Sequence, residues 1–403
     1  TADKEGKPNQ HLLKTFLQAR DILNKTKRNN WDKMGSQPTI DMDFVALPKI
    51  ELHAHLTGSI SRRTLHDIWV IKHEAGETDL EDPLVVMPDG KHDYDLTTFF
   101  PLFSSYIYNL ITDVDTLRKA TLSVLQDFQA DGVTYLELRT TPRSLPSPTP
   151  QPPSVYVAII LSAIDAFEAS SRDNPNAMRT RLILSVDRRH TPSQAHETVR
   201  LAASFRDRGV VGVDLCGDPA ARVHTGQDDD SENISIFRHA FAEARTLGLG
   251  ITIHFGEAEC SGHPAELAEI LSWSPRRLGH VIHLSEDVKR EIAKRGIGLE
   301  LCLSCNVHAG MVTGGFEGHH FGEWWGVEGS LISLGTDDVG VFGSPLSNEY
   351  RLVAEHFKLS RDEICALARR GIETIFADET EKERLRQVMW KPAVTTTVAA
   401  AQQ

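Results

Sequence analysis

The chain has 403 residues, of which 40% are hydrophobic and 25% are charged, a balance typical of a folded globular protein. It excludes a disordered chain, a collagen-like repeat and a coiled coil. The 43 Lys and Arg residues against 56 Asp and Glu residues give a net charge of −13, which disfavours nucleic acid polymers and anionic membranes as partners. Five scattered cysteines and a polar N-terminus favour a cytoplasmic enzyme.

The sequence pattern divides the chain into three parts. Apolar residues at helical spacing over 10–30 predict an N-terminal helix, which with its polar lead-in makes up residues 1–43. A folded domain is expected over 44–390, followed by a frayed tail over 391–403. Inside the domain, the proline-rich segment 142–154 is expected to be a surface loop of unassigned role.

Eight short apolar segments alternate with amphipathic helical segments along the domain. This alternation predicts an α/β fold, a (β/α)8 TIM barrel with an extra N-terminal helix. A doubly wound open sheet is the structural alternative, but the first strand is not followed by the GxGxxG turn of a dinucleotide-binding sheet. The predicted strands are 49–56, 133–141, 180–187, 210–218, 250–257, 278–283, 297–306 and 331–338.

Polar residues collect where these strands end, which is where barrel enzymes place their active sites. His53 and His55 are two residues apart in a strand, so their imidazoles point to the same side. Zinc is bound well by imidazole and carboxylate, and His254 and Asp337 can complete a four-residue set. The alternative for the His53–His55 pair alone is a solvated pair at a strand edge.

Three further polar residues accompany this set. His280 could ligate the metal or act as a base for water at the metal, because it lies on the strand after His254. Glu257 follows His254 by three residues, where a protonated carboxyl could serve as general acid; a rim salt bridge is the alternative. Asp338 adjoins Asp337 and points to the opposite side if the strand is regular, so one meets the metal and the other the substrate.

Other signals are weaker. The fourth strand has no lysine that could bridge two metals, which favours one metal ion per chain. The chain lacks the H-x-E motif of the His/Cys/Cys zinc deaminases, which excludes that class.

Cys302 and Cys305 are interpreted as two small residues on a strand rather than a metal or redox site. For His319 and His320, packing at the rim is at least as plausible as function.

Five motifs, taken in chain order, resemble the adenosine and AMP deaminase family. They are KIELHAHLTG (49–58), GVDLCGDP (212–219), IHFGE (253–257), LGH (278–280) and GTDD (335–338). The resemblance implies a zinc-dependent barrel of the metal-dependent hydrolase type that hydrolyses the 6-amino group of a purine. It implies that His53, His55, His254 and Asp337 are the zinc ligands, that Glu257 protonates purine N1, that His280 assists the attacking water, and that Asp338 and Gly217 contact N7 and N3.

Within the family, LELRTTPR (136–143) and HHFGEWW (319–325) resemble the adenosine deaminase-like branch, the N6-methyl-AMP deaminases. That resemblance implies conversion of N6-methyl-AMP and water to IMP and methylamine. We expect the protein to be a monomer. The resemblance implies substrate contacts at His55, Thr57, Tyr108, Thr140, Thr141, Pro142, Arg143, Asp187, Gly217 and Asp338. The branch often has asparagine at the position of Thr57 and histidine at that of Tyr108.

A 5′-phosphate on the substrate suits these residues. Adenosine deaminases proper carry an aspartate at the position of Thr57, where its charge would repel a phosphate, whereas a threonine can donate a hydrogen bond to it. Arg143 can supply a charged donor, and the turn 58–61 is expected to present free amides at a helix start. The alternative is that Arg143 only caps the proline-rich loop.

Three other functions remain open from the sequence. An ordinary adenosine or AMP deaminase releasing ammonia would use the same ligands and acid. Another metal hydrolase of this fold would act on a different amide or ring. A non-catalytic barrel is disfavoured, because binding alone does not require the zinc ligands together with the acid.

Overall fold

The computed structural model describes residues 40–392, except 92, 93, 95, 172, 173, 175 and 222–233. The predicted helix over 10–30 and nearly all of the predicted tail lie outside the described residues. A compact unit begins at Asp43 and carries every element named below.

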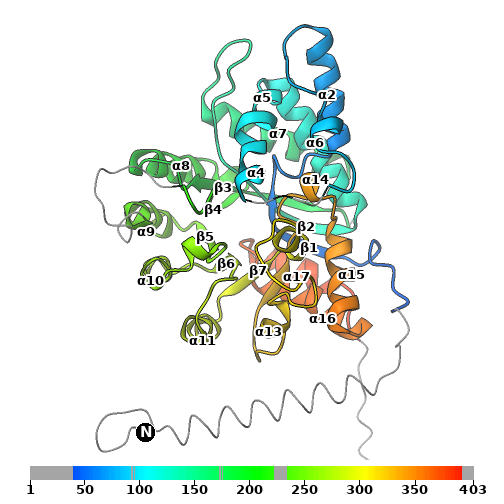
Figure 1. Cartoon of the computed structure of the whole chain (residues 1–403), viewed down its shortest axis with the longest axis vertical. Helices are drawn as coiled ribbons and strands as arrows, with labels where there is room; N and C mark the ends of the chain where they lie inside the picture. Colours follow the sequence, from blue (N-terminus) through cyan, green and yellow to red (C-terminus); the bar gives the residue numbers. More distant parts are fainter. Residues whose placement is uncertain are drawn as a thin grey trace, which may run out of the picture. The chain divides into compact units, whose positions relative to one another are not determined.

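Eight parallel strands form one sheet in the order of the chain, and the predicted barrel is confirmed (Figure 1). The sheet closes on itself between the first strand and the segment after the last one. There the Asp337 amide donates to the His53 carbonyl at 2.7 Å, and the His55 amide donates to the Asp337 carbonyl at 3.0 Å. The strands are β1 (Lys49–His55), β2 (Val133–Thr140), β3 (Arg179–Asp187), β4 (Val210–Cys216), β5 (Gly250–Phe255), β6 (Arg277–His280), β7 (Gly298–Leu301) and β8 (Ile332–Leu334).

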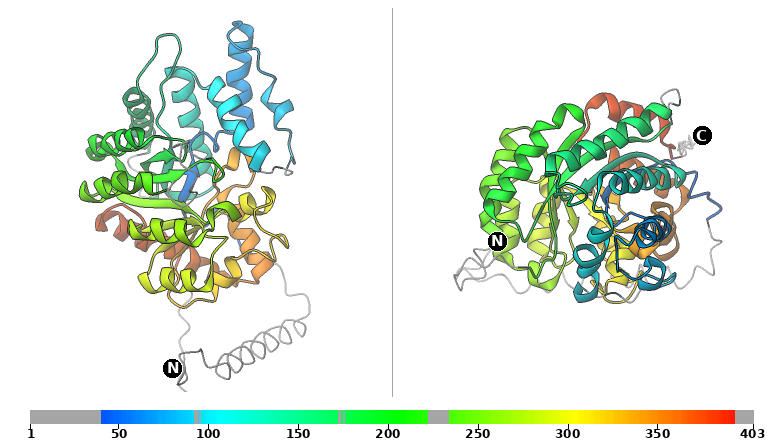
Figure 2. Two further views of the ribbon diagram at one scale, coloured as in Figure 1. Left: turned by 60° about the vertical axis from the view of Figure 1, so that its left-hand side comes forward. Right: turned by 90° about the horizontal axis from the view of Figure 1, so that it is seen from above.

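Helices cover the outside of the strands, as the end-on view in Figure 2 shows. The larger ones are α2 (Arg62–Glu74), α6 (Val114–Ala130), α7 (Pro153–Ser170), α8 (Pro192–Ser204), α9 (Arg238–Thr246), α10 (Pro264–Ser272), α11 (Glu286–Arg295), α15 (Leu346–Phe357), α16 (Arg361–Arg370) and α17 (Glu379–Val388). The shorter ones are α3 (Pro83–Val86), α4 (Leu96–Pro101), the π-helix η1 (Leu102–Ile107), α5 (Tyr108–Leu110), α12 (Leu303–His308), α13 (Phe321–Trp325) and α14 (Val339–Phe342). Single 3₁₀ turns are η2 (Arg206–Arg208), η3 (Ile234–Phe237), η4 (Glu259–Ser261) and η5 (Gly371–Glu373).

The sequence sets several helix boundaries through side chains that satisfy free backbone amides. The start of α6 is a capping box in which Asp113 accepts from the Thr116 amide and Thr116 accepts from the Asp113 amide. Helix α11 begins after Ser285, whose side chain accepts from Val288, and ends at Gly296 with a φ of 62°. These signals place the helices between the strands and so fix the connections of the barrel.

Helix α7 is long and apolar enough to cross a membrane by length and composition alone. In the barrel it packs against α6 and β3. Eight of its residues are buried there, among them Tyr156, Ile160 and Phe167. The helix therefore belongs to the outer layer of the barrel. It starts at Pro153, at the end of the proline-rich segment.

Three predicted strands are shorter than the apolar pattern suggests. Strand β6 ends at His280 because His280 and Val281 have left-handed φ angles of 62° and 52°, so His283 lies beyond the strand. Strand β7 ends at Leu301, and Cys302 caps the short helix α12. The prediction that the cysteine pair lies on a strand is therefore wrong for Cys302 and Cys305, because the backbone turns into a helix there.

The last strand also ends early. Strand β8 stops at Leu334, and Asp337 has a left-handed φ of 58°. The regular alternation expected for Asp337 and Asp338 therefore does not apply. Left-handed backbone is costly for residues with a side chain and is often found at functional sites. In the described part of the chain only five such residues occur, and His280 and Asp337 are two of them.

Candidate active site

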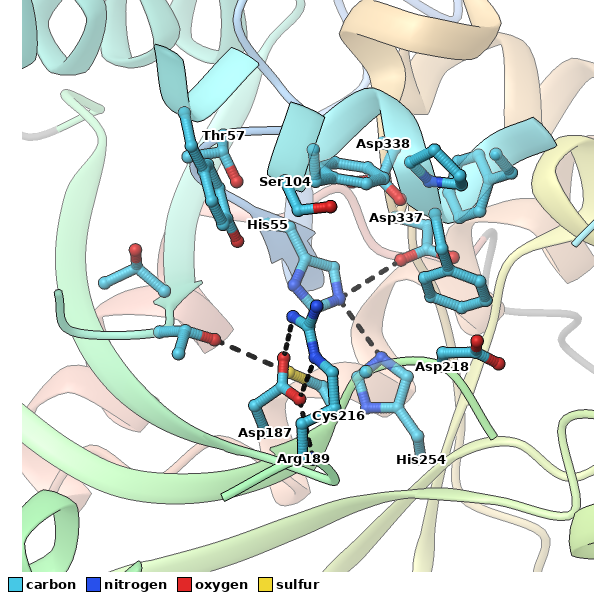
Figure 3. Close-up of a pocket in the computed structure, with 18 of the residues that line it drawn as sticks. His55, Thr57, Ser104, Asp187, Arg189, Cys216, Asp218, His254, Asp337 and Asp338 are labelled. Carbon is cyan, nitrogen blue, oxygen red and sulfur yellow. Dashed lines mark hydrogen bonds and ion pairs between the residues drawn. The ribbon is translucent and has the colours of Figure 1, made fainter. Parts of the chain in front are cut away.

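A cavity of about 290 Å³ opens at the carboxyl ends of the strands, a size that suits a small molecule (Figure 3). Its walls come from β1, β2, β3, β4, β5, the segment after β8, and the α4–η1 region. The lining residues are His55, Thr57, Phe99, Phe100, Pro101, Phe103, Ser104, Ser105, Tyr108, Thr140, Thr141, Asp187, Arg189, Cys216, Gly217, Asp218, His254, Glu257, Asp337 and Asp338.

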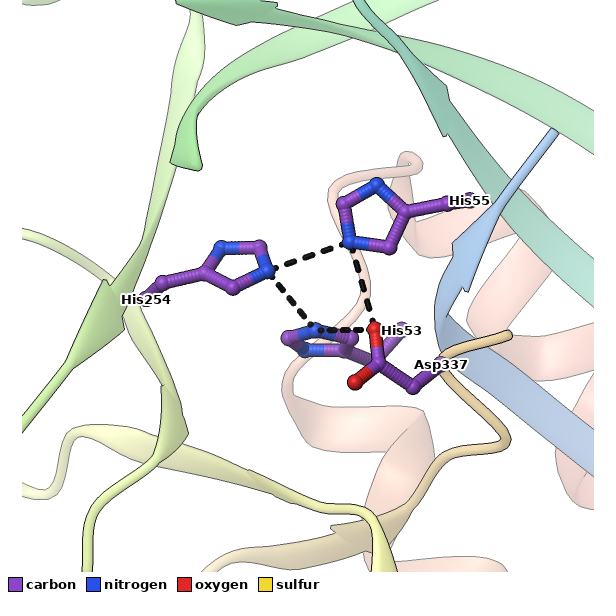
Figure 4. Close-up of side chains that lie close together, drawn as sticks. All are labelled: His53, His55, His254 and Asp337. Carbon is purple, nitrogen blue, oxygen red and sulfur yellow. Dashed lines mark hydrogen bonds and ion pairs between the residues drawn. The ribbon is translucent and has the colours of Figure 1, made fainter. Parts of the chain in front are cut away.

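The four predicted metal ligands meet at the bottom of this cavity. Figure 4 shows the His53, His55 and His254 rings and the Asp337 carboxylate turned toward one point. The Nε2 atom of His254 lies 3.2 Å from Nε2 of His53 and 3.1 Å from Nε2 of His55. Asp337 Oδ1 lies 3.5 Å from Nε2 of His53 and 3.3 Å from Nε2 of His55.

This geometry fits a zinc ion. Two ligand atoms that are each about 2.0–2.1 Å from a tetrahedral zinc are about 3.3 Å apart, which matches the four distances. Two of the three rings are also turned by partners at their other nitrogen. His53 Nδ1 lies 2.6 Å from Glu300, and His254 Nδ1 lies 3.1 Å from Asp214, so both Nε2 atoms face the cluster.

Electrostatics favour a cation at this point. Burial and Arg139 lower the pKa of His53, but Asp337 and Glu300 outweigh them, and the resulting pKa is about 9. The carboxylates therefore attract positive charge to the cluster. Burial lowers the pKa of His254 to about 4, so this ring is neutral and able to ligate a metal near pH 7.

A buried ionic network supports the ligands from below, and the motifs did not reveal it. Arg139 donates to Glu300 at 2.7 Å and lies 3.3 Å from Asp214, so it bridges the two carboxylates that hold His53 and His254. Arg277 donates to the other oxygen of Glu300 at 2.5 Å. All four side chains are fully buried. The sequence could have indicated this network, because its charged residues lie inside otherwise apolar strands. Charged side chains are rarely buried in such strands unless they are paired.

Glu257 and His280 lie next to the cluster. His280 Nε2 is 3.8 Å from Glu257 Oε1 and 3.8 Å from Asp337 Oδ2, and it has no hydrogen-bond partner among the described residues. Burial, reinforced by Asp337, raises the pKa of Glu257 to about 8, so this carboxyl is protonated at neutral pH. Burial lowers the pKa of His280 well below its ordinary value, so the ring is neutral.

Asp338 is buried beside these groups, and its Oδ1 has no hydrogen-bond partner within the described part of the chain. Burial and the neighbouring Asp337 and Glu257 raise the pKa of Asp338 well above its ordinary value. A protonated Asp338 can donate a hydrogen bond to a ligand. Gly58 makes room for it, since a Cβ at Gly58 would lie 1.5 Å from Oδ1 of Asp338.

Most of the substrate contacts expected from the sequence lie on the cavity wall: His55, Thr57, Tyr108, Thr140, Thr141, Asp187, Gly217 and Asp338. Pro142 and Arg143 are not among the lining residues. The Arg143 guanidinium stacks 4.5 Å from the Tyr108 ring centre and donates to the Ile111 carbonyl at 2.9 Å. Arg143 thus lies behind Tyr108 rather than on the cavity surface.

The expectation of free amides in the turn 58–61 is wrong for Ser59. The Ser59 amide is not free for an anion, because it donates to the His55 carbonyl at 2.8 Å. Helix α2 begins only after Ser61, whose side chain accepts from the Thr64 amide. The tight turn after β1 therefore uses the Ser59 amide for its own hydrogen bond.

The sequence also missed part of the wall. Phe99, Phe100 and Phe103 come from α4 and η1 and face the cavity with Ser104 and Ser105. Arg189 lines the cavity as well, in a bidentate pair with Asp187 at 2.8 and 2.7 Å, drawn in Figure 3. The cluster of phenylalanines in the sequence was a signal, but it resembles an ordinary core segment.

The comparisons with known proteins agree with this site. Residues 48–392 match the model of the family described as adenosine deaminase. The chain is 36% identical to an N6-mAMP deaminase of Arabidopsis thaliana over 85% of this chain and 96% of that protein. It is 34% identical to the N6-Methyl-AMP deaminase of Homo sapiens, over 87% of this chain and 95% of that protein.

Solved structures show the same likeness. The crystal structure of Arabidopsis ADAL complexed with IMP matches with a TM-score of 0.76 and 34% identity, covering 86% of this chain and 96% of that one. The complex of Arabidopsis ADAL with GMP matches with a TM-score of 0.75, over 86% and 97% of the two chains. The extent of these matches confirms the family predicted from the five motifs: the chain belongs to the adenosine deaminase family and is a hydrolytic purine deaminase.

Proposed function

We propose that the protein hydrolyses N6-methyl-AMP to IMP and methylamine, with one zinc ion per chain held by His53, His55, His254 and Asp337. The observation that carries the proposal is that these ligands, Glu257 and Asp338 meet around one cavity in a chain whose named relatives are N6-methyl-AMP deaminases. A zinc ion there would act as a Lewis acid that lowers the pKa of a water molecule toward neutrality.

The remaining chemistry falls to side chains around that centre. The protonated Glu257 carboxyl would donate its proton to N1 of the purine as water adds at C6. The protonated Asp338 carboxyl would donate to N7, and the backbone at Gly217 would contact N3. Gly217 has a φ of 100° and an added Cβ would lie 3.0 Å from Asp187, so no side chain can intervene there.

The 5′-phosphate would lie at the outer part of the cavity, near Thr57, Thr140 and Tyr108. All three are neutral, so none repels an anion. Arg143 would supply positive charge from behind Tyr108. A direct charge-assisted hydrogen bond to the phosphate, which contributes about 1.5–3 kcal/mol, would require the Tyr108 ring to turn aside. Arg143→Ala should therefore lower kcat/KM for the monophosphate by roughly tenfold to a hundredfold and leave kcat/KM for the nucleoside nearly unchanged.

A second candidate is an adenosine or AMP deaminase that releases ammonia. It is favoured by the position of Arg143 outside the cavity lining, because a nucleoside substrate needs no charged donor. It would use the same ligands and the same acid. The two candidates differ only in what the outer part of the cavity accepts.

A turnover panel separates these candidates. The zinc-loaded protein is given adenosine, AMP, N6-methyladenosine and N6-methyl-AMP, and release of ammonia or methylamine is followed. The proposal expects the highest kcat/KM with N6-methyl-AMP, and Thr57→Asp should reduce that preference through charge repulsion. A higher kcat/KM with adenosine or N6-methyladenosine would reject the monophosphate assignment.

A further inference from the structure

The two histidines His319 and His320 of the HHFGEWW motif take no part in the function proposed so far. Both are buried, with 2% and 8% of their surface exposed, and they precede α13. Their hydrogen bonds lead to His280, one through its ring and one through its backbone. The pair therefore has a specific connection to the active site.

The first connection starts at a donor of fixed direction. The backbone amide of Phe321 lies 3.0 Å from Nδ1 of His319. An amide N–H can only donate, so His319 Nδ1 is an acceptor. Burial lowers the pKa of His319 well below its ordinary value, so the ring is neutral and carries its hydrogen on Nε2.

That hydrogen orients the next side chain. His319 Nε2 lies 3.2 Å from Asn306 Oδ1, and Asn306 Nδ2 lies 3.0 Å from Nδ1 of His280. The opposite orientation of the Asn306 amide would place its N–H group against the N–H of His319. Only one orientation satisfies both contacts, and in it Asn306 donates to His280.

The consequence concerns the tautomer of His280. We propose that Asn306 and His319 are positioning residues that hold His280 with Nδ1 as an acceptor and its hydrogen on Nε2, facing the cavity. In this state His280 donates a hydrogen bond to an oxygen at the reacting centre. It cannot take a proton at Nε2, so the base role expected from its place in the sequence is replaced by a donor role.

The second histidine holds the backbone of the same residue. His320 Nε2 lies 2.6 Å from the His280 carbonyl oxygen, to which it can only donate. His280 has a left-handed φ of 62°, a conformation that needs support from its surroundings. The adjacent histidines of the motif thus fix the ring and the main chain of one active-site residue.

This inference bears on the proposed function but is tested without substrate. Protein labelled with ¹⁵N-histidine is studied by NMR, zinc-loaded and zinc-free, and the His280 signals are assigned as those lost in His280→Gln. The expected result is an unprotonated Nδ1 and an N–H at Nε2 of His280. A hydrogen on Nδ1 in the wild type would overturn the inference. The expected NMR result without turnover of N6-methyl-AMP would reject the proposed function alone.

Variants of the two positioning residues supply the matched tests. Asn306→Asp places an acceptor against His280 Nδ1, so the tautomer should reverse and kcat should fall roughly tenfold or more with KM and zinc content little changed. His319→Gln keeps a donor toward Asn306 and should retain the wild-type tautomer, whereas His319→Leu should not. Met311→Leu, which replaces the sulfur that accepts from Asn306 Nδ2 at 3.5 Å and keeps both contacts between His319, Asn306 and His280, is the control. An unchanged tautomer in Asn306→Asp would contradict the inference.

Discussion

The bottom of the active site and its outer wall are built on different principles. The bottom comprises the four ligands with Asp214, Glu300 and Arg139, and each of these side chains lies 2.5–3.5 Å from a charged group or an imidazole of the same set or from Arg277. The outer wall comprises α4, η1 and Tyr108, with Arg143 behind the Tyr108 ring, and it presents aromatic faces and hydroxyls.

The difference suggests a division of labour. Charges buried in pairs are held in one geometry, because separating them leaves an uncompensated ion, so the bottom suits chemistry common to every substrate. Aromatic and hydroxyl groups on short helices can change with little effect on the bottom, so the outer wall suits substrate selection. Substitutions should therefore fall into two classes, one affecting all substrates equally and one affecting their ratio.

The largest effect is expected from the ligands. His254→Ala or Asp337→Ala removes one of four contacts, so the protein should lose zinc and nearly all turnover. Metal analysis of purified protein and kcat with N6-methyl-AMP are the measurements. The exposed His239→Ala on α9 is the control for His254. Full activity in rigorously metal-free protein would contradict a zinc-dependent reaction.

Glu257→Gln should have the next largest effect. The amide keeps the shape of the side chain but cannot give a proton, so kcat should fall by roughly two or more orders of magnitude while zinc is retained. As the control, Glu259→Gln at an exposed position two residues later should leave kcat and zinc content unchanged. If kcat changes little in Glu257→Gln, another residue must be the general acid, and Asp338 is the next candidate.

The pKa of Glu257 also predicts a pH dependence. Its pKa is raised to about 8 by burial and by Asp337, and the protonated form is the active acid. Activity should therefore be present below pH 8 and fall as the pH rises through that value. The descending limb of kcat/KM against pH measures this. A profile that is flat through pH 9 would mean that no such acid is required.

A smaller effect is expected one layer below the ligands. Asp214→Asn keeps the shape beside His254 Nδ1 but removes the charge, and such changes typically cost tenfold to a hundredfold in metal affinity. Zinc competition against a chelator measures the loss, with the exposed Asp207→Asn as control. An unchanged zinc affinity would show that Asp214 does not support the ligand.

Much of the fold and the site could be predicted from the sequence. The His53–His55 spacing and the polar strand ends identified the cluster that the structure assembles, because a parallel barrel brings all carboxyl ends to one side. The support network was harder to see, since Arg139, Asp214 and Glu300 are separated by 75 or more residues and meet only in the closed barrel. Tertiary contacts also ended β6, β7 and β8 early, where the apolar pattern continued.

The most direct test of the division between bottom and outer wall is a ratio. The kcat/KM values for N6-methyl-AMP and N6-methyladenosine are measured in wild type, Glu257→Gln and Arg143→Ala, with Arg189→Ala, at the cavity arginine paired with Asp187, as a comparison. Glu257→Gln should lower kcat/KM for both substrates by the same factor. Arg143→Ala should lower kcat/KM only for the monophosphate, by roughly tenfold to a hundredfold. If Arg143→Ala lowers kcat/KM for both substrates equally, the outer wall does not select the phosphate, and the proposed division between bottom and outer wall is wrong.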